Sequence, residues 1–420
     1  MIQSVFSSVP FLRVVRVLLL VSAAASARAQ QQVPDYELPP VGYSKASPDT
    51  AVTELQRRIA AGELTFKETG RELLLAVLGA LHVPVESQTV VFSKTSLQKD
   101  RISPATPRAL YFSENVYVGW VPGGLIEVAA IDPRLGPVFY SLKANVADEP
   151  KAFVRDPACM LCHGYFFIRD VPSLIALTIF PDRDGETIAR SDFDLVNDAT
   201  RFEKRWGGWY VTGYTGKQDH RGNAFASGAG KEMKFVPSEK RPAELSEFFD
   251  TSRYPAGTSD MLTLLILEHQ MAAQNTITRV GQNVRLAKFA SEYEVVDQLL
   301  FRRSVRLPEG VAKNETFLKR FMADAKRSRA GDSLKDVAAE GRIFKNRCSY
   351  LIYSEAFAAL PAELKARIFN VLYDALHDES PAGRYAYLEP EEKRRIYEIL
   401  VETHPEARAH FEQRAAMGRG

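Results

Sequence analysis

The chain has 420 residues, of which 45% are hydrophobic and 25% charged, the composition of a globular protein with a sizeable core. Its 54 basic and 52 acidic residues give a formal net charge of only +2. This balance supplies no electrostatic argument for binding nucleic acid or an anionic membrane surface, so we expect neither as a partner.

The first 29 residues have the pattern of a secretory signal peptide. Arg13 and Arg16 precede the apolar run VLLLVSAAA, and small residues follow at Ala27 and Ala29, where a signal peptidase would cleave. This apolar run is shorter than a membrane-spanning helix, and no later stretch reaches the roughly 18 apolar residues that such a helix needs. We therefore expect a periplasmic or otherwise exported protein with no integral membrane segment after signal removal. An uncleaved N-terminal anchor is the alternative.

The remaining chain divides into five segments by the pattern of its residues. Residues 30–50 are rich in Pro, Gln and Ser, which predicts an extended leader, and 51–83 have the apolar spacing of one or two amphipathic helices. Short β-branched and aromatic runs, broken by Pro, Gly, Asp and Asn, predict strands and tight turns in 84–230. A polar linker is expected at 231–258, and helical spacing continues through 259–420.

These segments together predict an α+β fold. Its centre would be an antiparallel, β-rich domain that carries the chemistry, flanked by the N-terminal helical segment and a mostly helical C-terminal region. An antiparallel sheet is favoured over a parallel one because few helical segments separate the predicted strands.

The stretch CMLCH is the most informative part of the chain. It holds two of the three cysteines, Cys159 and Cys162, with His163 directly after the second. Cys-X-X-Cys-His is the attachment pattern of c-type haem. Two thiols one short turn apart can add across the two vinyl groups of a porphyrin, and the imidazole that follows can then reach the iron. Residue frequencies alone would produce this pattern in such a chain only about 2 times in 10,000.

Three other roles for these cysteines remain open. A disulfide between Cys159 and Cys162 is compatible with an oxidising compartment. A redox-active Cys-X-X-Cys is expected near a helix start in a βαβ unit, which the strand-rich surroundings do not provide. A zinc site needs four ligands, and the third cysteine, Cys348, has no companion Cys or His near it in sequence. We expect Cys348 to be a buried free thiol, with an intermolecular link as the alternative.

Residues 159–163 resemble the haem-binding motif of c-type cytochromes. The wider chain, notably RALYFSENVYVGWV, RWGGWYVTG and CSYLIYS, resembles a family of large exported bacterial proteins described as uncharacterised cytochromes. The first resemblance implies one covalently attached haem c, with thioether bonds to Cys159 and Cys162 and with His163 as the proximal iron ligand. It implies an exported monohaem cytochrome that transfers electrons to or from a redox partner protein of unknown identity. The second resemblance supplies no activity.

The sequence leaves the sixth iron ligand open. His269 lies on a predicted helix among apolar neighbours, and His220 lies in a predicted loop. Met271 shares the helix of His269 but lies on another face, and Met233 lies in a loop rich in Gly and Lys. A protein ligand at this position would make an electron carrier. An open position would permit a haem enzyme, such as a peroxidase or oxidoreductase, or a module that senses redox state or gas. Whether the chain is an enzyme is therefore not decided.

Aromatic and basic side chains are candidates for the surroundings of the haem. Trp206, Trp209 and Tyr210 could form an aromatic wall beside the porphyrin, and the simpler interpretation is a hairpin with ordinary aromatic packing. Four arginines could neutralise the haem propionates or be solvated surface charges: Arg155, Arg169, Arg201 and Arg205.

Overall fold

The computed structural model describes residues 33–144, 151–166, 168, 171–188, 193–228 and 232–417. The predicted signal peptide at 1–29 lies outside these residues. The predicted α+β class is confirmed, because the described chain combines helices with a seven-stranded antiparallel sheet. None of its described helices is both long and apolar enough to cross a membrane.

The large sheet has the strand order β6-β5-β4-β3-β2-β1-β9, and each neighbouring pair is antiparallel. Its strands are β1 (Thr89–Val91), β2 (Arg108–Phe112), β3 (Val116–Trp120), β4 (Ile126–Asp132), β5 (Gly136–Leu142), β6 (Val154–Arg155) and β9 (Trp209–Tyr210). Two small sheets pair β7 (Leu177–Thr178) with β8 (Asp194–Leu195) and β10 (Ala226–Ser227) with β11 (Lys234–Phe235). Strands β1 to β5 follow one another as a meander, so short turns suffice to build most of the large sheet.

One face of the large sheet packs against the N-terminal helices. Alternate residues of the central strands, such as Val118 and Val128, form a buried core with α2 (Ala51–Ala60) and α3 (Gly70–Ala80). The Thr50 hydroxyl accepts a hydrogen bond from the Thr53 N–H and thereby caps α2. We call this the first face of the sheet.

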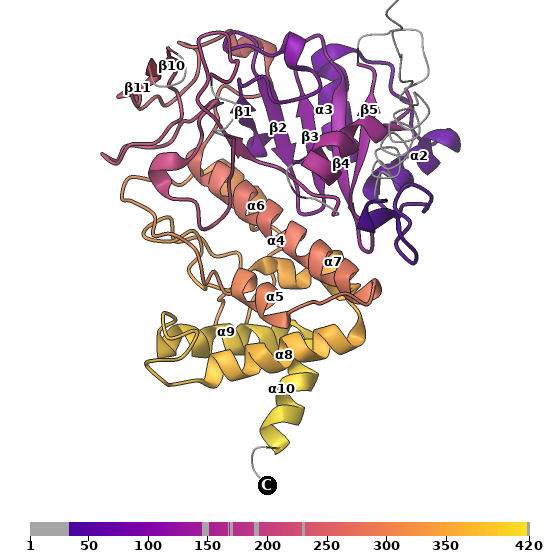
Figure 1. Ribbon diagram of the computed structural model, residues 1–420, viewed down its shortest axis with the longest axis vertical. Coiled ribbons are helices and arrows are strands. Elements are labelled where there is room, and N and C mark those ends of the chain that lie inside the picture. Colours follow the sequence, from indigo (N-terminus) through magenta and orange to yellow (C-terminus); the bar gives the residue numbers. More distant parts are fainter. Residues whose placement is uncertain are drawn as a thin grey trace, which may run out of the picture.

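The second face is turned towards helix α4 (Met261–Arg285), which lies beneath the sheet in Figure 1. The amide of Gln270 joins the two, because it donates to the Tyr117 hydroxyl at 2.7 Å and to the Ser113 carbonyl at 2.7 Å. Near the other end of the helix, Gln282 donates to the Leu135 carbonyl at 3.0 Å. Buried polar contacts of this kind fix which side of α4 faces the sheet.

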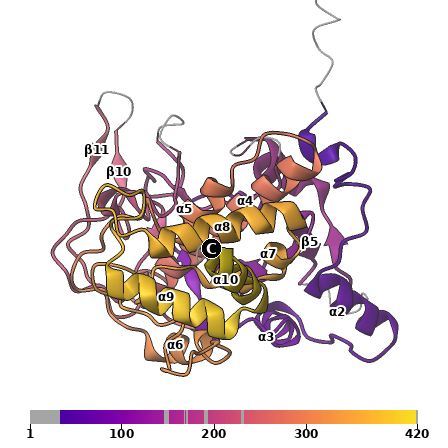
Figure 2. The ribbon, with the colours of Figure 1, turned by 90° about the horizontal axis from the view of Figure 1, so that it is seen from below.

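The remaining helices are α5 (Glu292–Leu299), α6 (Glu315–Phe321), α7 (Glu355–Ala358), α8 (Ala362–His377), α9 (Pro390–Thr403) and α10 (Pro405–Met417). Most of them pack on the side of α4 away from the sheet, whereas Phe317 of α6 packs against Phe112 of β2 with the ring centres 5.9 Å apart. Figure 2 shows α8, α9 and α10 on the underside of the molecule. Residues 322–349 were expected to be helical and are instead irregular. The run RAGDS supplies turn-forming residues there, and Gly331 adopts a φ of 86°.

Two segments differ from their expected character because their aromatic residues are buried. The expected leader, described from residue 33 onward, contains a short 3-10 helix (Asp35–Glu37) and buries Tyr36 and Tyr43 in the core of the first face. The expected linker at 231–258 contains β11 and buries Phe249 and Tyr254 in the same core. Both segments are polar overall, but each contains a few large apolar side chains. The burial of these side chains anchors both segments to the sheet.

Candidate functional site

The CMLCH segment follows the edge strand β6 as two short helical turns. Asp156 begins the first turn (Pro157–Cys159) by accepting a hydrogen bond from the Ala158 N–H at 2.9 Å. An acidic cap followed by proline is a favoured way to start a helical turn, so DPAC encodes this geometry locally. The second turn, Leu161–Phe166, is a π-helix, a form that is rare and often found at functional sites.

The His163 imidazole is held in one tautomer by the backbone. Its Nδ1 lies 2.8 Å from the Ser173 carbonyl oxygen, and because a carbonyl can only accept, Nδ1 carries the proton. The neutral ring therefore has its lone pair on Nε2, the atom that is free to bind a metal. Ser173 strengthens the link, since its N–H and hydroxyl both donate to the His163 carbonyl, at 2.8 and 2.9 Å.

The surroundings keep this imidazole neutral at pH 7. Burial lowers the pKa of His163 to about 4; the hydrogen bond to Ser173 opposes this effect, and the nearby Arg108 charge adds to it. The ring of Phe139 packs against the imidazole with the ring centres 4.3 Å apart. A neutral, oriented imidazole is the form that coordinates metal ions.

Both cysteines and the histidine lie at a cavity on the second face of the sheet. Cys159, Cys162 and His163 line a cavity of about 100 Å³, and an adjoining cavity of about 120 Å³ shares Cys159 and His163. The two cavities also share five wall residues, which are Arg108, Leu110, Glu127, Ile175 and Trp209. The motif therefore lies over a wall that is mostly apolar and that contains one acidic and one basic side chain.

The charged residues of this wall form an ion pair across strand β3. Arg108 Nη2 on β2 lies 2.7 Å from Glu127 Oε2 on β4. The intervening residue is Gly119, which is opposite Glu127 in the sheet, and a Cβ there would be 2.2 Å from Arg108 Nη2. Glycine thus makes room for the guanidinium to lie across the strand. The Arg108 Nε is buried and has no hydrogen-bond partner among the described residues.

Sequence reasoning missed this pair. Its signal was the alternation of the strands, because Arg108 in RALYF and Glu127 in IEVAAID occupy positions whose neighbours two residues away are apolar. A charge on the face of a strand that contacts the core is uncommon and marks a site.

Of the four candidates for the sixth ligand, Met271 is the one that the structure places in a cavity with His163. It lies on α4 one turn after Leu267, and both side chains line the 120 Å³ cavity. The Met271 side chain is almost completely buried. A third cavity, of about 670 Å³, also has Met271 and Leu174 in its wall. Met271 therefore lines both the cavity at the motif and a larger one.

His269 lies elsewhere, and neither of its ring nitrogens is free. Its Nδ1 donates to Asp198 Oδ2 at 3.0 Å, and its Nε2 lies 2.8 Å from the Ser349 hydroxyl. The ring stacks on Phe301 with the centres 4.2 Å apart. Although burial opposes ionisation of Asp198, the adjacent His269 and Arg205 lower the pKa of that carboxyl. The histidine thus belongs to a polar network on the side of α4 away from CMLCH.

His220 and Met233 are also apart from the motif. His220 is buried among the rings of Phe202, Trp206 and Tyr214, and its Nδ1 accepts a hydrogen bond from the Gly222 N–H at 3.1 Å. Burial lowers its pKa to about 3, and the Arg241 charge contributes. Met233 precedes β11 and is only partly buried. Neither residue is part of the walls described above.

The predicted aromatic wall is divided among three places. Trp209 lines both cavities, and its Nε1 donates to the Leu177 carbonyl at 2.7 Å. Trp206 packs edge-on against Phe202 in the cluster around His220. Tyr210, the neighbour of Trp209 in β9, points to the first face of the sheet because successive strand residues alternate.

None of the described arginines proposed for the propionates reaches the cavity. Arg155 donates to the carbonyls of Tyr43 and Ala46, and Arg205 forms a buried ion pair with Glu268. Arg201 pairs with Glu203 on the surface. Arg169 lies outside the described residues. The described arginine that lines both cavities is Arg108.

Cys348 is buried and makes no disulfide with either described cysteine of the motif. Burial raises the pKa of its thiol to about 12, which keeps it protonated and unreactive. Within the described ranges, no three His, Cys, Asp or Glu side chains gather as a group that could hold a metal ion.

No family model, no curated protein and no solved structure matches this chain. The assignment of a function must therefore come from the site itself.

The burial of His220 predicts a pH dependence of stability. Its folded pKa of about 3 is below the usual value of about 6.5, so its contribution to stability is complete above pH 6.5 and is lost as the pH falls from there towards 3. Between pH 7 and pH 5 this one group should lower the free energy of unfolding by about 2 kcal/mol. Urea denaturation of His220→Gln should show a smaller decrease over this interval than the wild-type protein. The matched control His377→Gln removes an exposed histidine and should show the wild-type decrease. Equal decreases in the free energy of unfolding of His220→Gln and wild type would contradict the lowered pKa of His220.

Proposed function

We propose that this chain is a monohaem c-type cytochrome that acts in electron transfer. Cys159 and Cys162 would carry the two thioether bonds, and His163 Nε2 would bind the iron. The observation that carries the proposal is the combination of the CMLCH motif with the hydrogen bond from His163 Nδ1 to the Ser173 carbonyl. That hydrogen bond leaves the correct nitrogen free beside both cysteines, which is the arrangement that an axial imidazole requires.

Three features of the described residues would suit a covalently bound haem. Both thiols are free and partly exposed, so they are accessible to a haem that is being attached. The wall opposite them offers the apolar side chains of Leu110, Ile175 and Trp209 to a flat ring. The Arg108 Nε is a buried donor without a partner, and a haem propionate is an acceptor that could satisfy it.

The chain itself would supply orientation, water exclusion and electrostatics, while the haem supplies a one-electron redox centre. Ser173 orients His163 and raises the basicity of the imidazole. The buried rings of Phe139 and Trp209 line the same cavity as this imidazole and would limit the access of water to it. The Arg108 charge lies beside the site and would stabilise negative charge there, which the ion pair with Glu127 partly offsets.

As a second protein ligand that would bind the iron we propose Met271. It lines a cavity with His163, whereas His269 has both nitrogens engaged and His220 lies in a separate aromatic cluster. A thioether in place of a second imidazole would raise the reduction potential. A ligand on a helix that is anchored to the sheet through Gln270 would move little on reduction, which favours fast electron transfer.

One observation favours a haem enzyme as the second candidate function. The Arg108–Glu127 pair is partly buried and lies at the cavity, where a carboxylate and a guanidinium could move a proton and stabilise a bound polar substrate. Carbon monoxide separates the two functions. A reduced spectrum that carbon monoxide does not change supports a six-coordinate carrier, and ready binding supports the enzyme.

Loss of one thioether should prevent stable haem attachment. We expect Cys162→Ala, exported from cells that mature c-type cytochromes, to lose haem-catalysed staining on a denaturing gel or to retain about a tenth of it or less, because one of the two cysteines of the attachment pattern is missing. Cys348→Ala is the matched control, since it removes a buried thiol that is far in sequence from the CMLCH motif. It should stain normally. Normal haem content in Cys162→Ala would refute the covalent assignment.

Replacement of the proposed distal ligand should change the spectrum and not the haem content. Met271→Leu preserves side-chain volume and removes the sulfur, so the oxidised protein should lose its sulfur-to-iron charge-transfer band, become high-spin and bind carbon monoxide when reduced. Met261→Leu is the matched control, because Met261 is a buried methionine on the same helix and is absent from the cavity wall. An unchanged spectrum in Met271→Leu with normal haem staining would exclude Met271 and leave the covalent attachment intact.

A further inference from the structure

Another pocket lies on the side of α4 that faces away from the CMLCH segment. Its volume is about 470 Å³, which is within the range of sites for small metabolites. Leu265 of α4, Asp198 and Arg205 lie at its wall, and the other walls come from 301–307, from 340–347 and from Tyr387. None of these residues lines the two cavities at Cys159 and His163.

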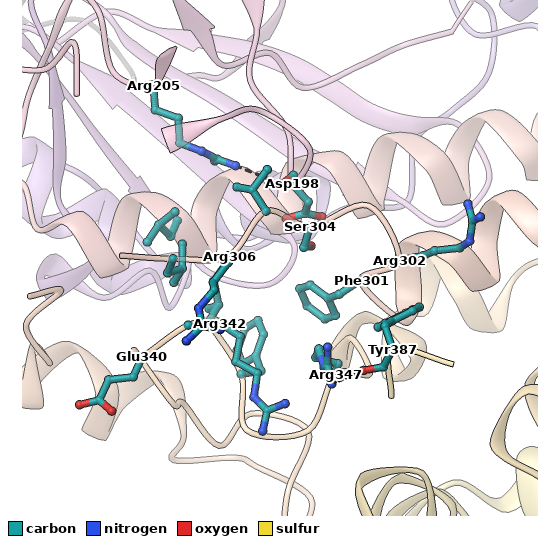
Figure 3. A pocket seen from close by; sticks show the side chains of 16 residues that line it. Asp198, Arg205, Phe301, Arg302, Ser304, Arg306, Glu340, Arg342, Arg347 and Tyr387 are labelled. Atoms are coloured by element: carbon teal, nitrogen blue, oxygen red, sulfur yellow. Dashed lines mark hydrogen bonds between the residues drawn. The ribbon is translucent and has the colours of Figure 1, made fainter. Parts of the chain in front are cut away.

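Three guanidinium groups, those of Arg306, Arg342 and Arg347, surround the same space in Figure 3. Arg342 and Arg347 share one buried carboxylate, Glu392, at 3.0 and 2.6 Å, so two positive charges are balanced by one negative charge. Arg306 is exposed and pairs with no carboxylate in the part of the chain that the structure describes. The pocket therefore has an excess of positive charge at this side.

The other charged groups of the wall are already neutralised or solvated. The Arg205 guanidinium forms an ion pair with Glu268 and donates hydrogen bonds to backbone carbonyls. Asp198 is occupied by hydrogen bonds from His269 and Gln298, the latter at 2.5 Å. Arg302 is 3.5 Å from Asp297.

The carboxylate that opposes the three guanidinium groups is that of Glu340. It is exposed, where water and salt screen its charge. Side-chain donors remain free on these arginines. Among the described residues, Arg342 uses only Nη1 to bind Glu392, and Arg347 uses only Nε and Nη2 to bind Glu392 and Tyr387.

Aromatic and aliphatic side chains form the rest of the wall. Phe301 lies just after α5 with a φ of 57°, a left-handed conformation that is costly for a bulky residue and usual for glycine at this position. The surrounding fold therefore holds Phe301 in a strained backbone conformation. Strained residues of this kind cluster at binding sites. Phe344 and Leu307 extend the apolar surface. Gly341, which also lines the pocket, has a left-handed backbone as well.

We propose that this pocket binds a small organic anion. A carboxylate or phosphate group would be held by Arg306, Arg342 and Arg347, whose planar donors suit both groups, and an apolar or aromatic portion would lie against Phe301 and Phe344. The proposal does not depend on the haem, since the two sites share no residue.

Isothermal titration of the full exported protein with four probes tests the proposal. Phenyl phosphate and benzoate carry both an anionic group and a ring, inorganic phosphate carries only the anion, and benzyl alcohol carries only the ring. We expect saturable binding of phenyl phosphate or benzoate, and the tighter of the two identifies the anionic group. The proposal is overturned if neither binds, if benzyl alcohol binds as tightly, or if inorganic phosphate binds as tightly as phenyl phosphate.

Arg306→Gln should weaken binding of the tighter probe at least tenfold, which corresponds to about 1.4 kcal/mol. The substitution is on an exposed side chain, so the far-UV circular dichroism should match that of the wild type. Arg329→Gln makes the same charge change on a side chain that is 93% exposed and outside the pocket, and it should bind as the wild type does. Equal losses in both variants would show general charge attraction and would contradict a site at Arg306.

Discussion

The hydrogen bond between His163 Nδ1 and the Ser173 carbonyl is the interaction on which the rest of the site depends. It fixes a neutral tautomer, orients the ring, and joins the π-helical turn to the segment that returns along the sheet. Without it, the imidazole could rotate and present the protonated nitrogen to the cavity. Ser173 contributes its backbone twice and its hydroxyl once, so the link is made mainly by main-chain atoms whose positions are set by the fold.

The sheet makes the site possible because its two faces contact different parts of the chain. The first face is closed by the N-terminal helices, and the second is left for the CMLCH segment and for α4. Gly119 is the residue that adapts the second face, since the missing side chain lets Arg108 lie across β3 to Glu127. On the other side of α4, the network of His269 and Asp198 borders the arginine-lined pocket, so one helix separates two sites.

Local patterns predicted what depends on local geometry. Alternating apolar runs predicted the antiparallel sheet, and the spacing of the motif placed two thiols and an imidazole together. Contacts between distant segments were not predictable in this way. His269 and Met271 are two residues apart on one helix, and only the packing of α4 decides which of them faces His163. Arg108 was overlooked for the same reason, because its partner Glu127 is brought to it by strand register.

The most direct test is mass spectrometry of the tryptic peptide that begins after Arg155 and contains both cysteines of the motif. The protein is exported from cells that mature c-type cytochromes, and digestion follows without reduction. Our account predicts a peptide heavier by one haem in which neither Cys159 nor Cys162 reacts with an alkylating reagent. A peptide of unmodified mass, with two thiols that alkylate or with a disulfide that alkylates after reduction, would contradict it.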